Sequence, residues 1–197
     1  MDRHDHIWVI QRPKTLNEDE RGATLNPPRS LCCAPAPPVL EFDADGVLVR
    51  SWGGPGAVAP ERARALRGPS GQRGLLYVCD RMNNRIQVFK KDGTFVREFV
   101  VAPATRGNGS VWDLDVSHDA PQTWLYNADG ENSHIWTLLR DNGQIVGKFG
   151  RHGRQAGQLH WVHNLAVDSK GNVYTAEVDS GKRAQQFVFK GVGPAEP

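Results

Sequence analysis

The chain has 197 residues, which is enough to bury one substantial hydrophobic core. Its formal net charge of +2 is too small to indicate a nucleic-acid-binding surface, and no apolar run is long enough to cross a bilayer. The first thirty residues are charged and lack an apolar centre, so no signal peptide is recognisable and the cellular location stays open. Three cysteines do not make a disulfide framework, and the adjacent Cys32 and Cys33 are expected to be free thiols rather than metal ligands.

The segment from Leu76 to Phe99 predicts three short strands joined by two tight turns. Read as a strand, this segment points Tyr77 and Cys79 to one face and Val78 and Asp80 to the other. The polar stretch that ends at Asn84 suits a turn, because Asn tolerates a left-handed backbone. Asp92-Gly93 is a strong signal for a two-residue hairpin.

This pattern recurs along the chain at a spacing of about fifty residues. Tyr126 lies 49 positions after Tyr77, and Tyr174 lies 48 positions after Tyr126. A split N-terminal copy covers residues 6–10 and 39–52, and further strands are expected at residues 110–117 and 162–168. Four strands in a unit of 40–50 residues are typical of a propeller blade, whereas solenoid repeats are usually shorter or helical.

Several of the predicted blades are incomplete. The Arg- and Gly-rich residues 62–74 show no alternation, so an inner strand is not expected before Leu76, and no outer strand is expected after Phe189. We therefore predict an all-β propeller of about four blades, at least two of them incomplete. The first blade covers residues 1–56 with a Pro-rich loop at 13–38, an irregular junction covers 57–75, three blades cover 76–191, and a tail covers 192–197.

Other residues have structural roles in this prediction. Strand aromatics are expected to fill the core between blades: Trp8, Trp112, Trp124, Trp136 and Tyr174. Asp80, Asp129 and Glu177 follow equivalent strands and are expected to make hydrogen bonds between blades.

The repeats resemble NHL repeats. Residues 77–99, 107–113 and 153–168 are similar to the bacterial NHL-repeat proteins akin to peptidyl-α-hydroxyglycine α-amidating lyase. Residues 5–10 and 32–42 resemble the first blade of that group. The resemblance implies an NHL-type propeller with a six-bladed parent, of which this chain would lack about two blades near residues 57–74.

The same resemblance implies a chemistry and some of its residues. The lyase converts a peptidyl-α-hydroxyglycine into a peptide amide and glyoxylate, using zinc held by three His, a Tyr, and Arg residues that bind substrate. His163 falls on one metal-ligand position and Arg81 on one substrate-binding or catalytic Arg position, while Asn164 stands where the lyase has Asp. The other ligands would lie in the missing part. Zinc is thus the implied cofactor, calcium is an alternative, and the chain by itself assures neither.

Each candidate residue has a structural alternative. His163 could simply line the central channel, and Arg81 could be a turn residue paired with Asp80 or Asp129. The candidate functions are an incomplete amidating-type lyase of doubtful activity and a non-catalytic module that binds a protein, peptide or glycan. The expected partner is a peptide or small-molecule substrate or a protein. RNA binding is disfavoured by the low net charge.

Overall fold

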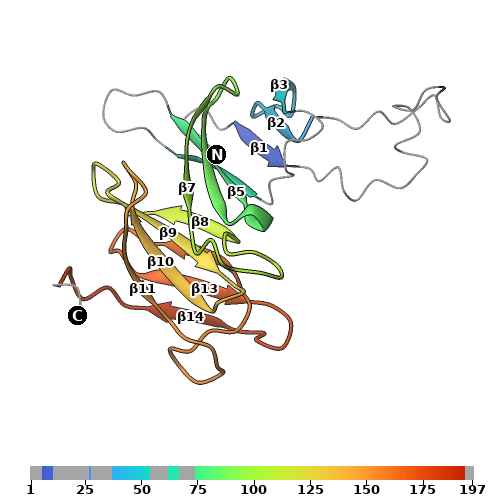
Figure 1. Cartoon of the computed structure of the whole chain (residues 1–197). Helices are drawn as coiled ribbons and strands as arrows, with labels where there is room; N and C mark the ends of the chain where they lie inside the picture. Colours follow the sequence, from blue (N-terminus) through green and yellow to red (C-terminus); the bar gives the residue numbers. More distant parts are fainter. Residues whose placement is uncertain (1–5, 11–26, 28–36, 54–61, 67–73, 194–197) are drawn as a thin grey trace.

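A computed structural model describes residues 6–10, 27, 37–53, 62–66 (backbone only) and 74–193. They form four antiparallel sheets of three or four strands, which follow one another in chain order (Figure 1). The predicted all-β fold and the four propeller-like units are confirmed. The predictions for the loop at 13–38 (apart from residues 27, 37 and 38), for Cys32-Cys33 and for the end of the tail lie outside the described residues.

The first two sheets cover the N-terminal half of the described chain. The first sheet has the order β1 (Ile7–Ile10), β2 (Val39–Phe42) and β3 (Leu48–Trp52), and the second has β4 (Arg62–Leu66), β5 (Leu75–Asp80), β6 (Arg85–Lys90) and β7 (Phe95–Val100). The prediction that the second unit lacks an inner strand was wrong. β4 pairs with β5 over five residues, and the short Arg-Ala-Arg-Ala alternation at its start is the strand signal that the Arg- and Gly-rich composition of residues 62–74 obscures.

The other two sheets cover the C-terminal half. The third has the order β8 (Asp113–Val116), β9 (Trp124–Asp129), β10 (His134–Leu139) and β11 (Ile145–Phe149). The fourth has only β12 (Val162–Val167), β13 (Val173–Glu177) and β14 (Ala184–Phe187). The expected absence of an outer strand after Phe189 is confirmed for the described residues.

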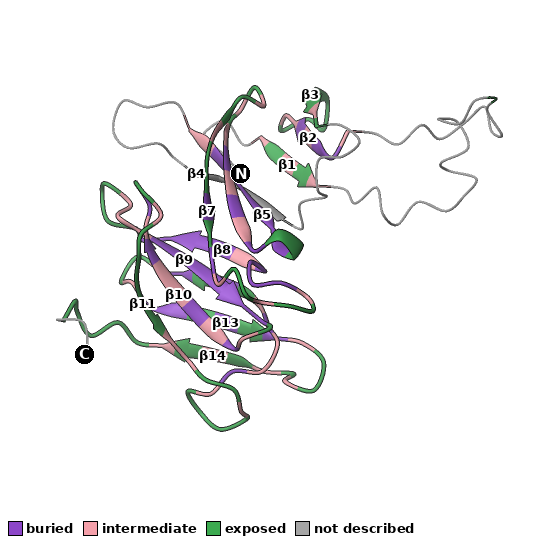
Figure 2. Cartoon of the chain, in the orientation of Figure 1, coloured by how far each residue is buried: buried purple, intermediate pink, exposed green. Residues whose placement is uncertain are grey.

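Neighbouring sheets pack face to face, and the buried residues gather in the seams between them (Figure 2). Because successive side chains of a strand point to opposite faces, each inner sheet contributes residues to two seams. Tyr77 and Cys79 face the third sheet, whereas Leu76 and Val78 face the first. In the third sheet, Tyr126 takes the place of Tyr77 and lies in the seam with the fourth. The repeated Tyr is therefore a seam residue.

Tyr174 is an exception to this rule, and the prediction that it is buried was wrong. Tyr77 and Tyr126 are 3% and 7% exposed, whereas Tyr174 is 40% exposed. The fourth sheet is the last one in the row, so among the described residues no further sheet covers the face that carries Tyr174. Trp112 is buried as expected, and Trp8, Trp124 and Trp136 are partly buried at the seams.

Carboxylates join the inner strands of the third and fourth sheets. Asp113 accepts a hydrogen bond from the Leu165 N–H at 3.0 Å, and Asp115 accepts one from the Val167 N–H at 2.8 Å. Both N–H groups belong to the edge of β12 that no other strand of the described residues pairs with. The two side chains thus satisfy donors that an uncovered strand edge would leave unpaired.

Candidate functional site

The two residues singled out by the resemblance, Arg81 and His163, both contact one buried tryptophan, Trp112. The Arg81 guanidinium lies 3.5 Å from the centroid of the Trp112 ring. The His163 ring meets Trp112 edge-on, with centroids 5.6 Å apart and an interplanar angle of 90°. These three side chains come from the second sheet, the start of the third and the fourth, so three blades converge here.

The backbone fixes Arg81 tightly in this position. Arg81 begins the 3₁₀ turn η3 (Arg81–Asn83), which directly follows β5, and it is only 9% exposed. Its Nε donates a hydrogen bond to the carbonyl of Asn108 at 2.5 Å. A Cβ atom on Gly109 would lie 1.9 Å from the Arg81 carbonyl oxygen, so only glycine allows this approach.

Trp112 is the centre of the arrangement. Its ring is 2% exposed, and its Nε1 donates a hydrogen bond to the Gly109 carbonyl at 2.7 Å. A guanidinium over an indole face is an attractive cation–π contact, strengthened here by the exclusion of water. Asp80, predicted as one partner of Arg81, forms an ion pair with Arg85 at 2.7 Å.

The loop before β12 continues the cluster with more aromatic rings. Trp161 meets Trp112 edge-on with centroids 5.4 Å apart, and the His160 and His152 rings follow it at centroid distances of 6.3 and 5.2 Å. We call Trp112, Trp161, His152, His160 and His163 the aromatic–histidine cluster. Trp161 has a backbone φ of +52°, a conformation that is rare for a bulky side chain and that tends to occur at functional sites.

The histidines of this cluster have hydrogen-bond partners of their own. The His163 Nδ1 lies 3.2 Å from the Asn164 side-chain oxygen, and the His160 Nε2 lies 2.9 Å from the Ser180 hydroxyl. The His152 Nδ1 lies 3.3 Å from the Ser133 hydroxyl. His160 lies in the loop that precedes β12.

These residues do not fit the three-histidine zinc site that the resemblance implies. Catalytic zinc needs three convergent protein ligands and an open position. Within the described residues, no group of three or more His, Cys, Asp or Glu side chains is placed to hold one ion. His163 therefore remains a single candidate ligand, and we assign no metal-dependent step to it.

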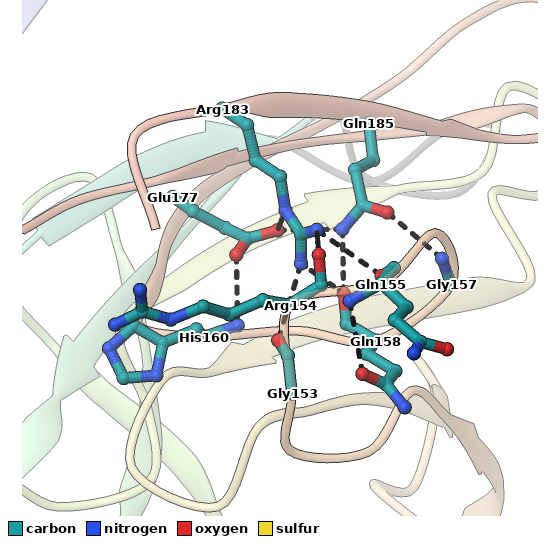
Figure 3. A network of polar contacts seen from close by, with 9 residues as sticks. All are labelled: Gly153, Arg154, Gln155, Gly157, Gln158, His160, Glu177, Arg183 and Gln185. Carbon is teal, nitrogen blue, oxygen red and sulfur yellow. Dashed lines mark hydrogen bonds and ion pairs between the residues drawn. The ribbon is translucent and has the colours of Figure 1, made fainter. Parts of the chain in front are cut away.

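A polar network secures the loop that carries His152, His160 and Trp161 (Figure 3). The Arg183 Nε donates to Glu177 at 2.9 Å, and its two terminal nitrogens donate to backbone carbonyls of the loop residues Gly153, Arg154, Gln155 and Gln158. Glu177 also accepts from the His160 N–H at 2.9 Å and from Gln185 at 2.6 Å. The last sheet thereby holds the histidine-bearing loop in place.

The three acidic residues that follow equivalent strands do not all act as predicted. Asp80 bonds to Asn83 and Arg85, and Asp129 bonds to Asn132 and Trp136, all within their own sheets. The prediction of bonds between blades is thus wrong for these two, because each carboxylate turns back over its own hairpin. Only Glu177 reaches the loop that connects two sheets. Burial raises the pKa of Asp129 despite the hydrogen bonds from Trp136 and Asn132.

Sequence reasoning did not assign two residues of this region to a functional site. Trp112 was expected to be core, and its contacts with both candidate residues depend on three separate sheets, which no local pattern reports. Arg183 carried no prediction, although it lies six positions after Glu177 much as Arg85 lies five after Asp80. That shared spacing is the signal that could have found it.

Solved structures support the fold. Neither a family model nor a curated protein matches the sequence. A protein of unknown function from Bacteroides caccae matches with a TM-score of 0.55 and 15% identity, over 74% of this chain and 50% of that one. A streptogramin B lyase matches with a TM-score of 0.51 and 10% identity, over 77% and 48%. Virginiamycin B lyase from Staphylococcus aureus matches with 0.50 and 15%, over 78% and 49%.

These likenesses define the class. The chain has the fold of part of a β-propeller, and it spans about half the length of the solved propellers it matches. At these identities the likeness concerns the fold and not the activity. No helix within the described residues has the length and apolar character needed to cross a membrane.

Proposed function

We propose that this chain is a propeller module that binds a peptide-like ligand at the aromatic–histidine cluster. The observation that carries the proposal is the convergence of Arg81, Trp161 and His163 on Trp112 from three blades. Ligands of multi-blade folds are recognised where side chains from several elements meet, by a few polar groups set among aromatic ones.

The chemistry of the cluster indicates what the ligand carries. Trp161 and His163 are partly exposed, so both can contact a ligand. The buried Trp112 contacts both rings, and the buried Arg81 stacks on Trp112. An indole offers a flat apolar surface to a side chain, and an imidazole can donate to a carbonyl or carboxylate. A peptide end with an apolar side chain and a free carboxylate matches both groups.

A calorimetric titration tests this proposal. Short apolar peptides with a free C-terminal carboxylate are titrated into the purified chain, and the same peptides with a C-terminal amide serve as a comparison. We expect binding of the carboxylate form, and a loss of about tenfold or more for Trp161→Ala. Trp136→Phe, on the outer part of the third sheet, is the control and should bind as the unaltered chain does. Equal binding by Trp161→Ala and the unaltered chain would refute the site.

A second candidate is lyase chemistry of the amidating type, as in the NHL-repeat proteins that the sequence resembles. It is favoured by the position of His163 at the start of an inner strand, and by two matched structures that are named lyases. The test incubates the chain with a peptidyl-α-hydroxyglycine and added zinc, and measures glyoxylate release against His163→Ala. Glyoxylate release that is lost in His163→Ala would favour the lyase. Glyoxylate release no faster than in buffer alone would refute the lyase and favour the binding module.

A further inference from the structure

The part of the chain that carries the aromatic–histidine cluster is basic and contains no acidic residue. Residues 142–167 include no Asp or Glu, although the whole chain has 22 of them. The stretch includes Trp161, so one side of the proposed peptide site is built from a segment without negative charge. Its basic residues and histidines are Lys148, Arg151, His152, Arg154, His160 and His163.

Two arginines of this stretch have no partner for their charge. Arg151 and Arg154 are exposed, and neither side chain forms an ion pair with another described residue. Arg154 contributes only its backbone carbonyl to the polar network of Figure 3. Lys148 differs from them, because its ammonium already contacts His134 and the Trp136 ring. The two arginines are therefore the cations that a ligand can reach.

Acidic side chains on neighbouring elements do not cancel this charge. Glu177 is buried within the polar network of Figure 3. Glu131 and Asp113 each accept a hydrogen bond from a backbone N–H. Asp179 is exposed in the loop that follows β13, and the same loop carries the exposed Lys182, which has the opposite charge. The surface beside the histidines therefore has a net positive charge.

A row of rings leads from Trp161 toward the arginines. The His160 ring lies 6.3 Å from the Trp161 ring, and the His152 ring lies 5.2 Å from the His160 ring, centroid to centroid. His152 is adjacent to Arg151 in the sequence and two positions from Arg154. An extended chain advances about 3.3–3.6 Å per residue, so the row corresponds to about two or three residues of a bound peptide.

We propose that the peptide bound at the aromatic–histidine cluster carries an acidic side chain about two or three residues before its C-terminus, and that Arg151 and Arg154 bind this side chain. The inference rests on the proposed function, because it takes Trp161 and His163 as the groups that hold the C-terminal residue. A guanidinium matches a carboxylate with two parallel N–H···O bonds. Since exposed ion pairs are individually weak, the arginines select among peptides rather than supply most of the affinity.

Two peptides that differ at one position test the inference. Both end in an apolar residue with a free carboxylate, and one has Glu three residues before the end where the other has Gln. Calorimetric titration at low salt should show that the Glu peptide binds about three- to tenfold more tightly. Salt at about 0.5 M should remove most of the difference, because it screens exposed charges beyond a few ångströms.

A double variant locates the preference. Arg151→Gln with Arg154→Gln should bind both peptides equally, and should bind the Gln peptide as tightly as the unaltered chain does. The matched control is Lys170→Gln with Lys190→Gln. It removes the same number of positive charges from exposed positions that follow β12 and β14 in the fourth sheet. The control should keep the preference for the Glu peptide.

The outcomes separate this inference from the binding function on which it rests. Equal binding of the two peptides by the unaltered chain would overturn the inference and leave the peptide site in place. A preference for the Glu peptide that survives in the arginine double variant would also overturn it. Absence of binding by either peptide would overturn the proposed function, and the inference with it.

Discussion

The Arg81 guanidinium lies 3.5 Å from the centroid of the Trp112 ring, and the Nε of the same side chain bonds to the Asn108 carbonyl at 2.5 Å. One buried side chain thus ties the end of β5 to the loop that leads into the third sheet. Because Trp112 also contacts His163 and Trp161, this stack supports the part of the aromatic–histidine cluster that Trp112 touches.

Arg81→Lys is expected to destabilise the fold by about 1 to 3 kcal/mol, since lysine lacks the planar guanidinium and cannot stack and bond in the same geometry. Urea unfolding followed by tryptophan fluorescence measures the change. Arg106→Lys, an exposed arginine of the neighbouring loop, is the control and should leave the midpoint in place. Equal midpoints for both variants would contradict a supporting role for the stack.

Gly109→Ala should be more damaging than its small size suggests. The added Cβ would lie 1.9 Å from the Arg81 carbonyl oxygen, and the backbone φ at Gly109 is +73°. We expect a loss of about 2 to 4 kcal/mol in the free energy of unfolding, from the clash and the left-handed backbone. Near-ultraviolet circular dichroism should also change as Trp112 shifts.

Gly147→Ala is the matched control for Gly109→Ala. Its backbone is ordinary and its surroundings are open, so alanine should be neutral or slightly stabilising. Similar losses for the two variants would mean that the close approach at Gly109 does not govern the site.

The sequence predicts strands better than it predicts the site. Alternation from Tyr77 to Cys79 correctly assigns the faces of β5, because a strand has a fixed side-chain period. The prediction fails for β4, whose short Arg-Ala-Arg-Ala alternation lies in an Arg- and Gly-rich stretch, and for Tyr174, whose exposure depends on whether another sheet follows. The stack of Arg81 on Trp112 joins two sheets, and no local pattern encodes that contact.

Arg183→Met should release the loop that carries His160 and Trp161. The change removes the bonds to Gly153, Gln158 and the other loop carbonyls and leaves the buried Glu177 without its cation. Removing one partner of a buried ion pair costs on the order of 3 kcal/mol. Hydrogen-exchange mass spectrometry should show faster exchange in residues 153–160.

Arg154→Met provides the control for this loop. Arg154 contributes only its backbone carbonyl to the network in Figure 3, so the bond from Arg183 survives the change. Exchange in residues 153–160 should then stay as in the unaltered chain. If both variants exchange alike, the network does not hold the loop.

Asp129→Asn should alter how stability depends on pH. Burial raises the pKa of Asp129 in the folded chain above its unfolded value of about 4, more than the hydrogen bonds from Trp136 and Asn132 lower it. Between these two pKa values the folded state holds a proton that the unfolded state has released. The stability of the unaltered chain relative to Asp129→Asn should therefore fall as the pH rises through that window.

Asp168→Asn should change the pH dependence of stability in the opposite direction. Desolvation alone would raise the pKa of Asp168, but hydrogen bonds from Asn172 and the nearby backbone outweigh it and lower the pKa below its usual range. The stability of the unaltered chain relative to Asp168→Asn should therefore be fully present above a pH of about 4 and decline as the pH falls through the lowered pKa. Urea unfolding at intervals from acidic to neutral pH measures both differences. Slopes of the same sign would show that burial does not dominate at Asp129, where the carboxylate closes the turn that precedes β10.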